Sequence, residues 1–488
     1  MHDQRSDAVM AAGVRGLATY VPPGRLSVDE WRRHWPGVGG PGGVRSVSVA
    51  GYDEDIVTMG VEAVDAVLAS TDAAIDDIDF LVVATCSSPY AEHSVATEVA
   101  RAVGLPRSAA LVDLAGSALG GVAALAAATD AVNSGRARNA LVVASERRRG
   151  SLGTAVEALG SGSVAMLVSN NGSVAIDGTA SWRHGVPTRW RPDGDGGLHH
   201  YDDTRYEVNG QVVPAISAVL GQLEVEAPFF SAFGPLDAKA VTTVARAVGA
   251  KGELGSTEVA TLGDLGSAAP LFALAGCLSP WPPAGERGVC AAVEPGSGAL
   301  AVALTVHTST PVVARRPEPV AVGYVEYLQR SGVLTGPTPP EPIVPYAATP
   351  GAARDDVDGG LAGARCEACG SMFVPPRRVC LDCGGDRFTI EQAPRSGTVV
   401  TFNVQHVVAV HPEPAPVAVG VVRLTGEGGQ RGGQVSAMFC DSDLGSLSVG
   451  AAVEMVYRRI GVDDGLVKYG WKARVATFDD NGPGGVHP

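Results

Sequence analysis

Four cysteines form two closely spaced pairs near residue 370. Cys366 and Cys369 make one CxxC knuckle, and Cys380 and Cys383 make a second one. Two such knuckles let four thiolates reach one ion, which suits structural Zn²⁺ because no coordination position remains for a substrate. Two redox-active CxxC pairs are the alternative, although paired knuckles are far more specific for a metal than a single CxxC. We therefore predict a zinc site with an architectural role.

The other cysteines are scattered, which is typical of structural thiols in a reduced, cytoplasmic protein. They are Cys86, Cys277, Cys290 and Cys440. The N-terminus has no long apolar core behind a basic start, and no stretch is apolar for long enough to span a bilayer. We therefore expect neither a signal peptide nor a membrane partner. The net charge of −15 argues against nucleic acid as the main partner, although a local basic patch could still bind CoA.

The elements that must position any site are a series of apolar runs in the first part of the 488-residue chain. Residues 80–85, 140–145 and 163–169 are nearly continuous apolar runs, typical of strands buried on both faces. AALVDLA at 109–115 is a further strand, and the stretches before and after it have helical spacing, which gives the order βαβαβ and predicts a mixed or parallel sheet covered by helices. A second block, from about residue 226 to residue 307, repeats this order. The pattern indicates a duplicated α/β unit.

A proline-rich segment separates these blocks from the C-terminal part of the chain. Residues 311–360 include TGPTPPEPIVP, a composition that disfavours helices and central strands, so we predict a linker there. Beyond it, β-rich runs alternate with glycine-rich turns, and this spacing predicts a small barrel.

The C-terminal part resembles the rubredoxin-like zinc-ribbon/OB family that accompanies thiolase-superfamily enzymes. The matching residues are the cysteine cluster, PPRR at 375–378 and YGWKARV at 469–475. This resemblance implies a zinc ribbon at 361–390 and an OB-fold barrel at 391–480. In that family the module docks beside a thiolase-fold subunit and helps to seat the CoA-linked substrate, whereas here both parts lie on one chain.

Residues 13–310 resemble hydroxymethylglutaryl-CoA synthase of the archaeal type and, more distantly, ketoacyl-ACP synthase III. The landmarks, in order, are EDIVTMGVEAVDAVL (54–68), SSPYAEHSVATEVARAVGL (87–105), VDLAGSALGGVAAL (112–125), LGSGSVAMLV (159–168), WRP (190–192) and GSGALAVAL (296–304). The resemblance implies a duplicated thiolase fold, layered αβαβα, with halves at 1–170 and 171–310. It also implies a homodimer, an acyl-CoA or acyl carrier protein as partner, and CoA or phosphopantetheine as part of the substrate.

The sequence departs from the family at the positions where the resemblance places catalysis. The family uses a thiolate nucleophile, a His and an Asn that hold the thioester carbonyl and, in the synthase, a Glu as general base. Those positions here carry Ala118, Phe233, Asp264 and Cys86, respectively. A methyl group cannot carry an acyl chain, so the resemblance implies loss of the usual Cys-His-Asn machinery.

Three residues near these positions are candidates for other chemistry, each with a structural alternative. Ser117 could be acylated if a base removes its proton, or it could simply be a small residue at a tight turn. Cys86 could be a nucleophile if its pKa were lowered, or inert packing. Asp264 could act as general acid or base if desolvation raises its pKa, or it could cap a local turn.

Together these patterns lead to two functional hypotheses. The first is an enzyme of secondary metabolism that performs aldol, retro-aldol, cyclisation or acyl-transfer chemistry on a CoA- or ACP-linked substrate. The second is a non-catalytic pseudo-synthase, a scaffold or thioester-binding partner in a biosynthetic complex, whose pocket would be filled by Phe233. Binding of single-stranded nucleic acid is disfavoured, because the C-terminal part has few aromatic residues and no dense basic run.

Overall fold

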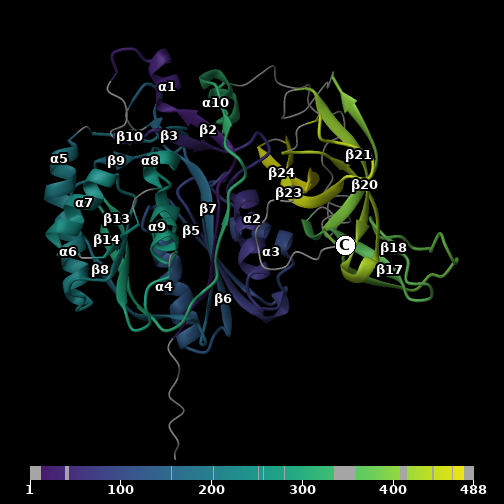
Figure 1. Cartoon of the computed structure of the whole chain (residues 1–488), viewed down its shortest axis with the longest axis horizontal. Helices are drawn as coiled ribbons and strands as arrows, with labels where there is room; N and C mark the ends of the chain where they lie inside the picture. Colours follow the sequence, from purple (N-terminus) through teal and green to yellow (C-terminus); the bar gives the residue numbers. More distant parts are fainter. Residues whose placement is uncertain are drawn as a thin grey trace, which may run out of the picture. The chain divides into compact units, whose positions relative to one another are not determined.

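The structure is a computed structural model that forms two compact units, residues 1–336 and 337–488 (Figure 1). The structure describes residues 12–476 except 39–42, 155–156, 202, 251, 256–257, 280, 335–358, 407–414, 442–443 and 464.

The described part of the first unit is built on one continuous hydrogen-bonded sheet in the order β12-β11-β13-β14-β8-β1-β7-β6-β4-β5, with β15 beside β1. The strands of the N-terminal half are β1 (Gly13–Tyr20), β4 (Ile78–Thr85), β5 (Ala110–Ala115), β6 (Asn139–Arg147) and β7 (Ser161–Ser169). Those of the C-terminal half are β8 (Val174–Trp182), β11 (Phe230–Gly234), β12 (Glu253–Leu254), β13 (Arg287–Glu294) and β14 (Gly298–Val306).

The two halves have the same topology. From the centre outward the N-terminal half runs β1-β7-β6-β4-β5, and the C-terminal half runs β8-β14-β13-β11-β12. If the five strands of each half are numbered in the order in which they occur in the chain, both halves have the spatial order 1-5-4-2-3. The halves join where Gly13 and Val14 of β1 pair antiparallel with Ala175 and Val174 of β8. The predicted duplicated α/β unit is confirmed.

Helices form the other layers of this unit (Figure 1). The principal ones are α2 (Ile56–Ala69), α3 (Val95–Val103), α4 (Gly120–Asn133), α6 (Val213–Gln222), α7 (Ala238–Ala247) and α9 (Ala269–Cys277). Helices α4 and α9 pack against each other and share one core cluster with strands of both halves, so they form the central layer. Helix α9 is apolar and buried on nearly every side, as a central helix must be. Helices α2 and α3 cover the N-terminal half, and α6 and α7 cover the C-terminal half.

Part of the predicted linker is folded instead. Within 311–334 the chain forms β15 (Val312–Arg315), which pairs with β1, and α10 (Tyr324–Arg330). The linker prediction is wrong for these residues because the prolines lie between the elements rather than inside them. Residues 335–358 of the predicted linker lie outside the described part.

Short elements complete the first unit. They are η1 (Ile75–Asp77), β9 (Arg189–Trp190), β10 (His199–His200), α5 (Thr204–Tyr206), a π-helix at Glu207–Val212, α8 (Val259–Leu262) and η4 (Gly266–Ala268). Strands β2 (Gly24–Ser27), β3 (Ser46–Val49) and β16 (Val320–Ala321) form a separate sheet near α1 (Val28–His34).

A buried carboxylate joins helix α10 to α1. Glu157 is 2% exposed and accepts hydrogen bonds from Trp31 Nε1 at 2.8 Å, Tyr324 Oη at 2.6 Å and the Gly153 amide at 2.6 Å. Burial, together with this hydrogen bond to Glu157, raises the pKa of Tyr324 above its ordinary value. The tyrosine therefore stays protonated and keeps donating.

Replacing Glu157 by alanine is expected to lower the free energy of unfolding by about 2–3 kcal/mol, because buried donors are left without an acceptor. Urea denaturation measures the change. Asp29→Ala is the control, since Asp29 forms an exposed i,i+3 pair with Arg32, and it should change stability by less than about 0.5 kcal/mol. Equal effects of the two variants would contradict the assigned role of Glu157.

The second unit contains a small three-stranded sheet, which lies next to the CxxC pairs, and a five-stranded sheet. The small sheet has the order β18-β17-β19, and the larger has the order β22-β21-β20-β23-β24. Their elements are β17 (Ala362–Cys366), β18 (Met372–Phe373), β19 (Phe388–Gln392), β20 (Ser396–Gln405), β21 (Val417–Thr425), η5 (Glu427–Gly429), β22 (Arg431–Met438), β23 (Ala452–Asp463) and β24 (Leu466–Val475). A bridge between Phe439 and Ala473 brings the ends of the larger sheet close to closure. One core cluster includes Met372 and Val374 beside barrel residues, so ribbon and barrel fold against each other.

Within the described residues, no helix has the length and apolar character needed to cross a membrane.

Candidate functional site

The turn between β5 and α4 is the centre of the candidate site. Gly116 has φ 87°, a left-handed conformation that favours glycine, and it turns the chain from the strand into the helix. Ser117 Oγ accepts a hydrogen bond from the Leu119 amide at 3.1 Å, which fits the predicted structural role of a small residue at a tight turn. Ala118 follows, 6% exposed, just before the N-cap residue Leu119 of α4.

The same serine also contacts a carboxylate of the other half. Ser117 Oγ donates to Glu294 Oε2 at 2.5 Å, and Glu294 is the half-buried last residue of β13. The two residues are 177 positions apart in the chain. The fold therefore places an acidic side chain directly at the turn that carries Ala118.

Glu146, on β6, joins the strand end near Cys86 to the loop before α9. It is fully buried and accepts hydrogen bonds from the Cys86 amide (2.8 Å), Ser87 Oγ (2.7 Å) and the amide and hydroxyl of Ser267 (3.0 and 2.6 Å). Burial and the charge of Glu146 raise the pKa of Cys86 well above its ordinary value. Cys86 is thus held as a neutral thiol, which favours the packing alternative over a low-pKa nucleophile.

Asp264 lies between two arginines. Its Oδ1 is 2.6 Å from Arg148 Nη1 and accepts the Gly266 amide at 2.7 Å, and its Oδ2 is 3.3 Å from Arg189 Nη1. Burial acts to raise the pKa of Asp264, but the charges of Arg148 and Arg189 outweigh it and hold the pKa below its ordinary value. Of the two alternatives for Asp264, this geometry favours the turn cap over the acid or base with a raised pKa, because the arginines offset the desolvation. Asp264 is an ionised carboxylate that also caps the local turn.

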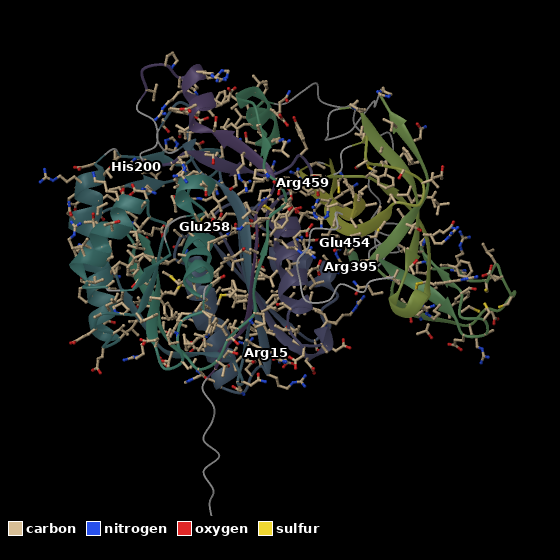
Figure 2. All side chains as sticks on the ribbon, viewed as in Figure 1. Arg15, His200, Glu258, Arg395, Glu454 and Arg459 are labelled. Atoms are coloured by element: carbon tan, nitrogen blue, oxygen red, sulfur yellow. The ribbon has the colours of Figure 1, made fainter. Side chains whose placement is uncertain are left out.

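The ion pairs continue outward from Asp264. Arg189 Nη2 contacts Glu207 Oε1 at 2.8 Å, and Glu207 also accepts from Thr188 Oγ1 at 2.9 Å and lies 3.1 Å from His200 Nε2. Figure 2 shows His200 near the edge of the first unit, on the β9–β10 hairpin. Burial favours the neutral acid, but the contacts with His200 and Arg189 lower the pKa of Glu207 to about 2. Charge pairs therefore connect the hairpin to the interior of the site.

Phe233 does not join this group. Its ring is 2% exposed and lies in the apolar cluster that α6 and α7 cover, together with Val241 and Val289. The preceding Ala232 belongs instead to the central cluster around α4 and α9. Because side chains alternate along a strand, Phe233 faces away from the central layer. The prediction that it fills the inherited pocket is wrong for this reason.

Several charged residues of the site were not among the candidates chosen from the sequence: Glu146, Arg148, Arg189, Glu207 and Glu294. A signal for two of them was present. Arg148 and Glu294 each follow or end an apolar strand run, and α/β folds place ligand sites at such strand ends.

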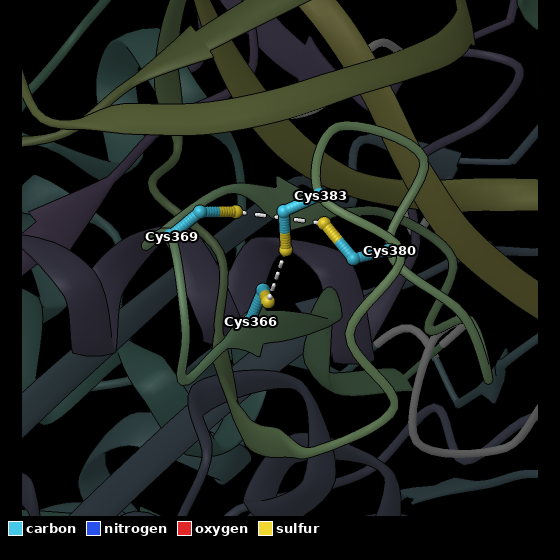
Figure 3. A group of neighbouring side chains, drawn as sticks. All are labelled: Cys366, Cys369, Cys380 and Cys383. Atoms are coloured by element: carbon cyan, nitrogen blue, oxygen red, sulfur yellow. Dashed lines mark hydrogen bonds between the residues drawn. The ribbon is translucent and has the colours of Figure 1, made fainter.

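The four cysteines of the second unit come together as predicted (Figure 3). Their sulfur atoms all lie within 4.8 Å of one another, with Cys366–Cys383 at 3.6 Å and Cys369–Cys380 at 3.5 Å. Zn–S bonds of about 2.3 Å in a tetrahedron place sulfurs about 3.8 Å apart. The donor set therefore fits a structural zinc ion.

Comparisons with known proteins agree with this geometry. The hydroxymethylglutaryl-CoA synthase of Archaeoglobus fulgidus is 27% identical over 323 residues, covering 63% of this chain and 92% of that protein. That of Methanocella arvoryzae is 32% identical over 192 residues, covering 38% of this chain and 55% of its own length, so the chain spans about half of that relative. A solved hydroxymethylglutaryl-CoA synthase complexed with CoA has a TM-score of 0.57 at 17% identity, covering 66% of this chain and 90% of that one. The first unit has a thiolase-like fold.

The second unit, which follows the thiolase-like unit in the chain, matches two family models. Residues 357–389 match "ChsH2, rubredoxin-like zinc ribbon domain", and residues 391–458 match "ChsH2, C-terminal OB-fold domain". Both predicted resemblances, the thiolase-like one and the zinc-ribbon/OB one, are therefore confirmed.

Proposed function

We propose that this protein acts on an acyl group held as a thioester by CoA or an acyl carrier protein, and that it works without a cysteine-bound acyl intermediate. The observation that carries the proposal is Ala118 at the turn before α4, beside the Ser117–Glu294 hydrogen bond. Support for the substrate class comes from proteins of this fold solved with 3-hydroxy-3-methylglutaryl coenzyme A and, in the curacin biosynthetic pathway, with an acetyl donor-ACP.

The reaction class that fits is carbon–carbon bond chemistry: aldol or retro-aldol cleavage, cyclisation, or acyl transfer without thiolate catalysis. These reactions need a proton taken from the substrate or returned to it, which a carboxylate can do. The setting we propose is secondary metabolism in the cytoplasm, with the chain as a homodimer and zinc in a structural role. Bound zinc would be held by Cys366, Cys369, Cys380 and Cys383, and it would stabilise the ribbon without touching substrate.

A specific observation favours the alternative of a non-catalytic thioester-binding partner. Glu146 is saturated with hydrogen bonds, and Asp264 and Glu207 are neutralised by arginines. A site whose carboxylates mainly hold the fold together is suited to binding rather than to proton transfer.

Native mass spectrometry of the full chain with acetyl-CoA, malonyl-CoA and a longer acyl-CoA tests the proposal. The expected result is a non-covalent acyl-CoA adduct with no covalent acyl mass, because Ala118 offers no nucleophile. A covalent acyl mass that disappears in Ser117→Ala or Cys86→Ala would show that an acyl intermediate does form, and would contradict the proposal. If neither CoA nor an acyl carrier protein binds, substrate handling is excluded and the scaffold alternative stands.

A further inference from the structure

The candidate site holds four carboxylates, those of Glu146, Glu207, Asp264 and Glu294, and the last of these contacts the turn that carries Ala118. Three of these carboxylates have both oxygens occupied by hydrogen bonds or ion pairs. Glu146 has no exposed surface and accepts hydrogen bonds at both oxygens. Asp264 is bound by two guanidinium groups, and Glu207 by one guanidinium and a histidine ring. None of these three can accept a substrate proton without losing a structural partner.

Glu294 differs from the other three in its surroundings. In the described part of the chain its carboxylate has a single hydrogen-bond partner, the Ser117 hydroxyl, and no cationic partner. A carboxylate has about four acceptor positions, so most of its capacity is unused. It is also half-buried rather than sealed. A base needs this combination of a negative charge, free lone pairs and access.

Glu294 also lies at the turn where the resemblance to the synthases places the reacting thioester. Its hydroxyl partner, Ser117, directly precedes Ala118 on the turn. Strand alternation puts Glu294 on the same face as Ala292, which belongs to the central cluster around α4 and α9. After burial and Glu146, its charge also contributes to the raised pKa of Cys86, so the carboxylate lies near enough to the thiol to act on it electrostatically.

We propose that Glu294 is the catalytic base of this site and removes a proton from the α-carbon of the bound acyl thioester. The C–H bond breaks, its proton forms an O–H bond on the carboxylate, and its electron pair moves onto the thioester carbonyl oxygen as an enolate. The reverse step returns the proton. Ser117 is a positioning residue, since its O–H holds one carboxylate oxygen while the other faces the substrate. This inference rests on the proposed function.

The test is deuterium exchange into acetyl-CoA in D₂O, catalysed by the full chain and followed by mass spectrometry. Glu294→Gln should slow exchange by about 100-fold or more, because the amide cannot accept the proton. The amide oxygen still accepts the Ser117 hydroxyl, so the turn is preserved and the acyl-CoA adduct in native mass spectrometry should be unchanged. Glu294→Asp, which keeps a carboxylate, should recover part of the rate.

Glu286→Gln is the matched control, because Glu286 is a half-buried glutamate just before the opposite end of β13. It should exchange at the wild-type rate. Wild-type rates in Glu294→Gln, or no exchange by a wild-type protein that still binds acyl-CoA, would overturn the role of Glu294 and leave the proposed function standing. Absence of both binding and exchange would instead remove the CoA form of the proposed function together with this inference.

Discussion

Replacing Cys380 by serine is expected to abolish zinc binding and to unfold the ribbon around it. Cys380 is 2% exposed, and its sulfur lies with three others that fit one ion. Structural zinc contributes about 10–16 kcal/mol of apparent binding free energy, which is comparable to the whole stability of a domain. Metal analysis should find about one zinc per wild-type chain and none in the variant. Hydrogen exchange should increase across β17 to β19.

The effect should extend beyond the ribbon, since Met372 and Val374 pack in the same core cluster as barrel residues such as Val399. Cys86→Ser is the control and should retain zinc, because Cys86 lies outside the cluster. If the two CxxC pairs were redox-active instead, the wild-type protein would bind no zinc and would form disulfides. A zinc-free wild-type protein with disulfides that a reductant opens would contradict the structural zinc site.

Replacing Arg148 by methionine is expected to lower the free energy of unfolding by about 3–5 kcal/mol. The Arg148 and Asp264 side chains are only 10% and 15% exposed. The variant therefore leaves the buried negative charge of Asp264 with the more distant Arg189 as its remaining cationic partner among the described residues. Urea denaturation measures the change. The double variant Arg148→Met/Asp264→Leu should recover much of the loss, because it removes both charges. Arg32→Met, at an exposed pair with Asp29, should cost less than about 0.5 kcal/mol.

The same ion pair determines a pH dependence. The folded-state pKa of Asp264 is below its ordinary value of 3.8, so its contribution to stability is present above that pH. The contribution is lost as the pH falls from 3.8 through the lower folded-state pKa, where the carboxylate becomes protonated in both states. Asp264→Asn should therefore show a shallower loss of stability with acid than wild type. An identical acid dependence would contradict the assigned ion pairs.

Local patterns in the sequence were sufficient for some features. The CxxC pairs predict the cysteine cluster because both knuckles and the hairpin between them lie within 18 consecutive residues, Cys366 to Cys383. Alternating apolar runs identify the α/β layers, since burial of a strand on both faces leaves a continuous apolar segment. The same approach failed for the segment around β15 and α10, where proline content concealed short elements that fit between the prolines.

The sequence by itself determined the fold class and the pairing of the four cysteines into one cluster, and it places alanine at position 118. Only the tertiary structure decided which carboxylates of the candidate site are paired with cationic or several polar groups and which, among the described residues, accepts a single hydroxyl. Asp264 is 116 positions from Arg148, and Ser117 is 177 positions from Glu294. Charge interactions and desolvation depend on distances in space, so the state of these side chains follows from how the two halves pack around α4 and α9.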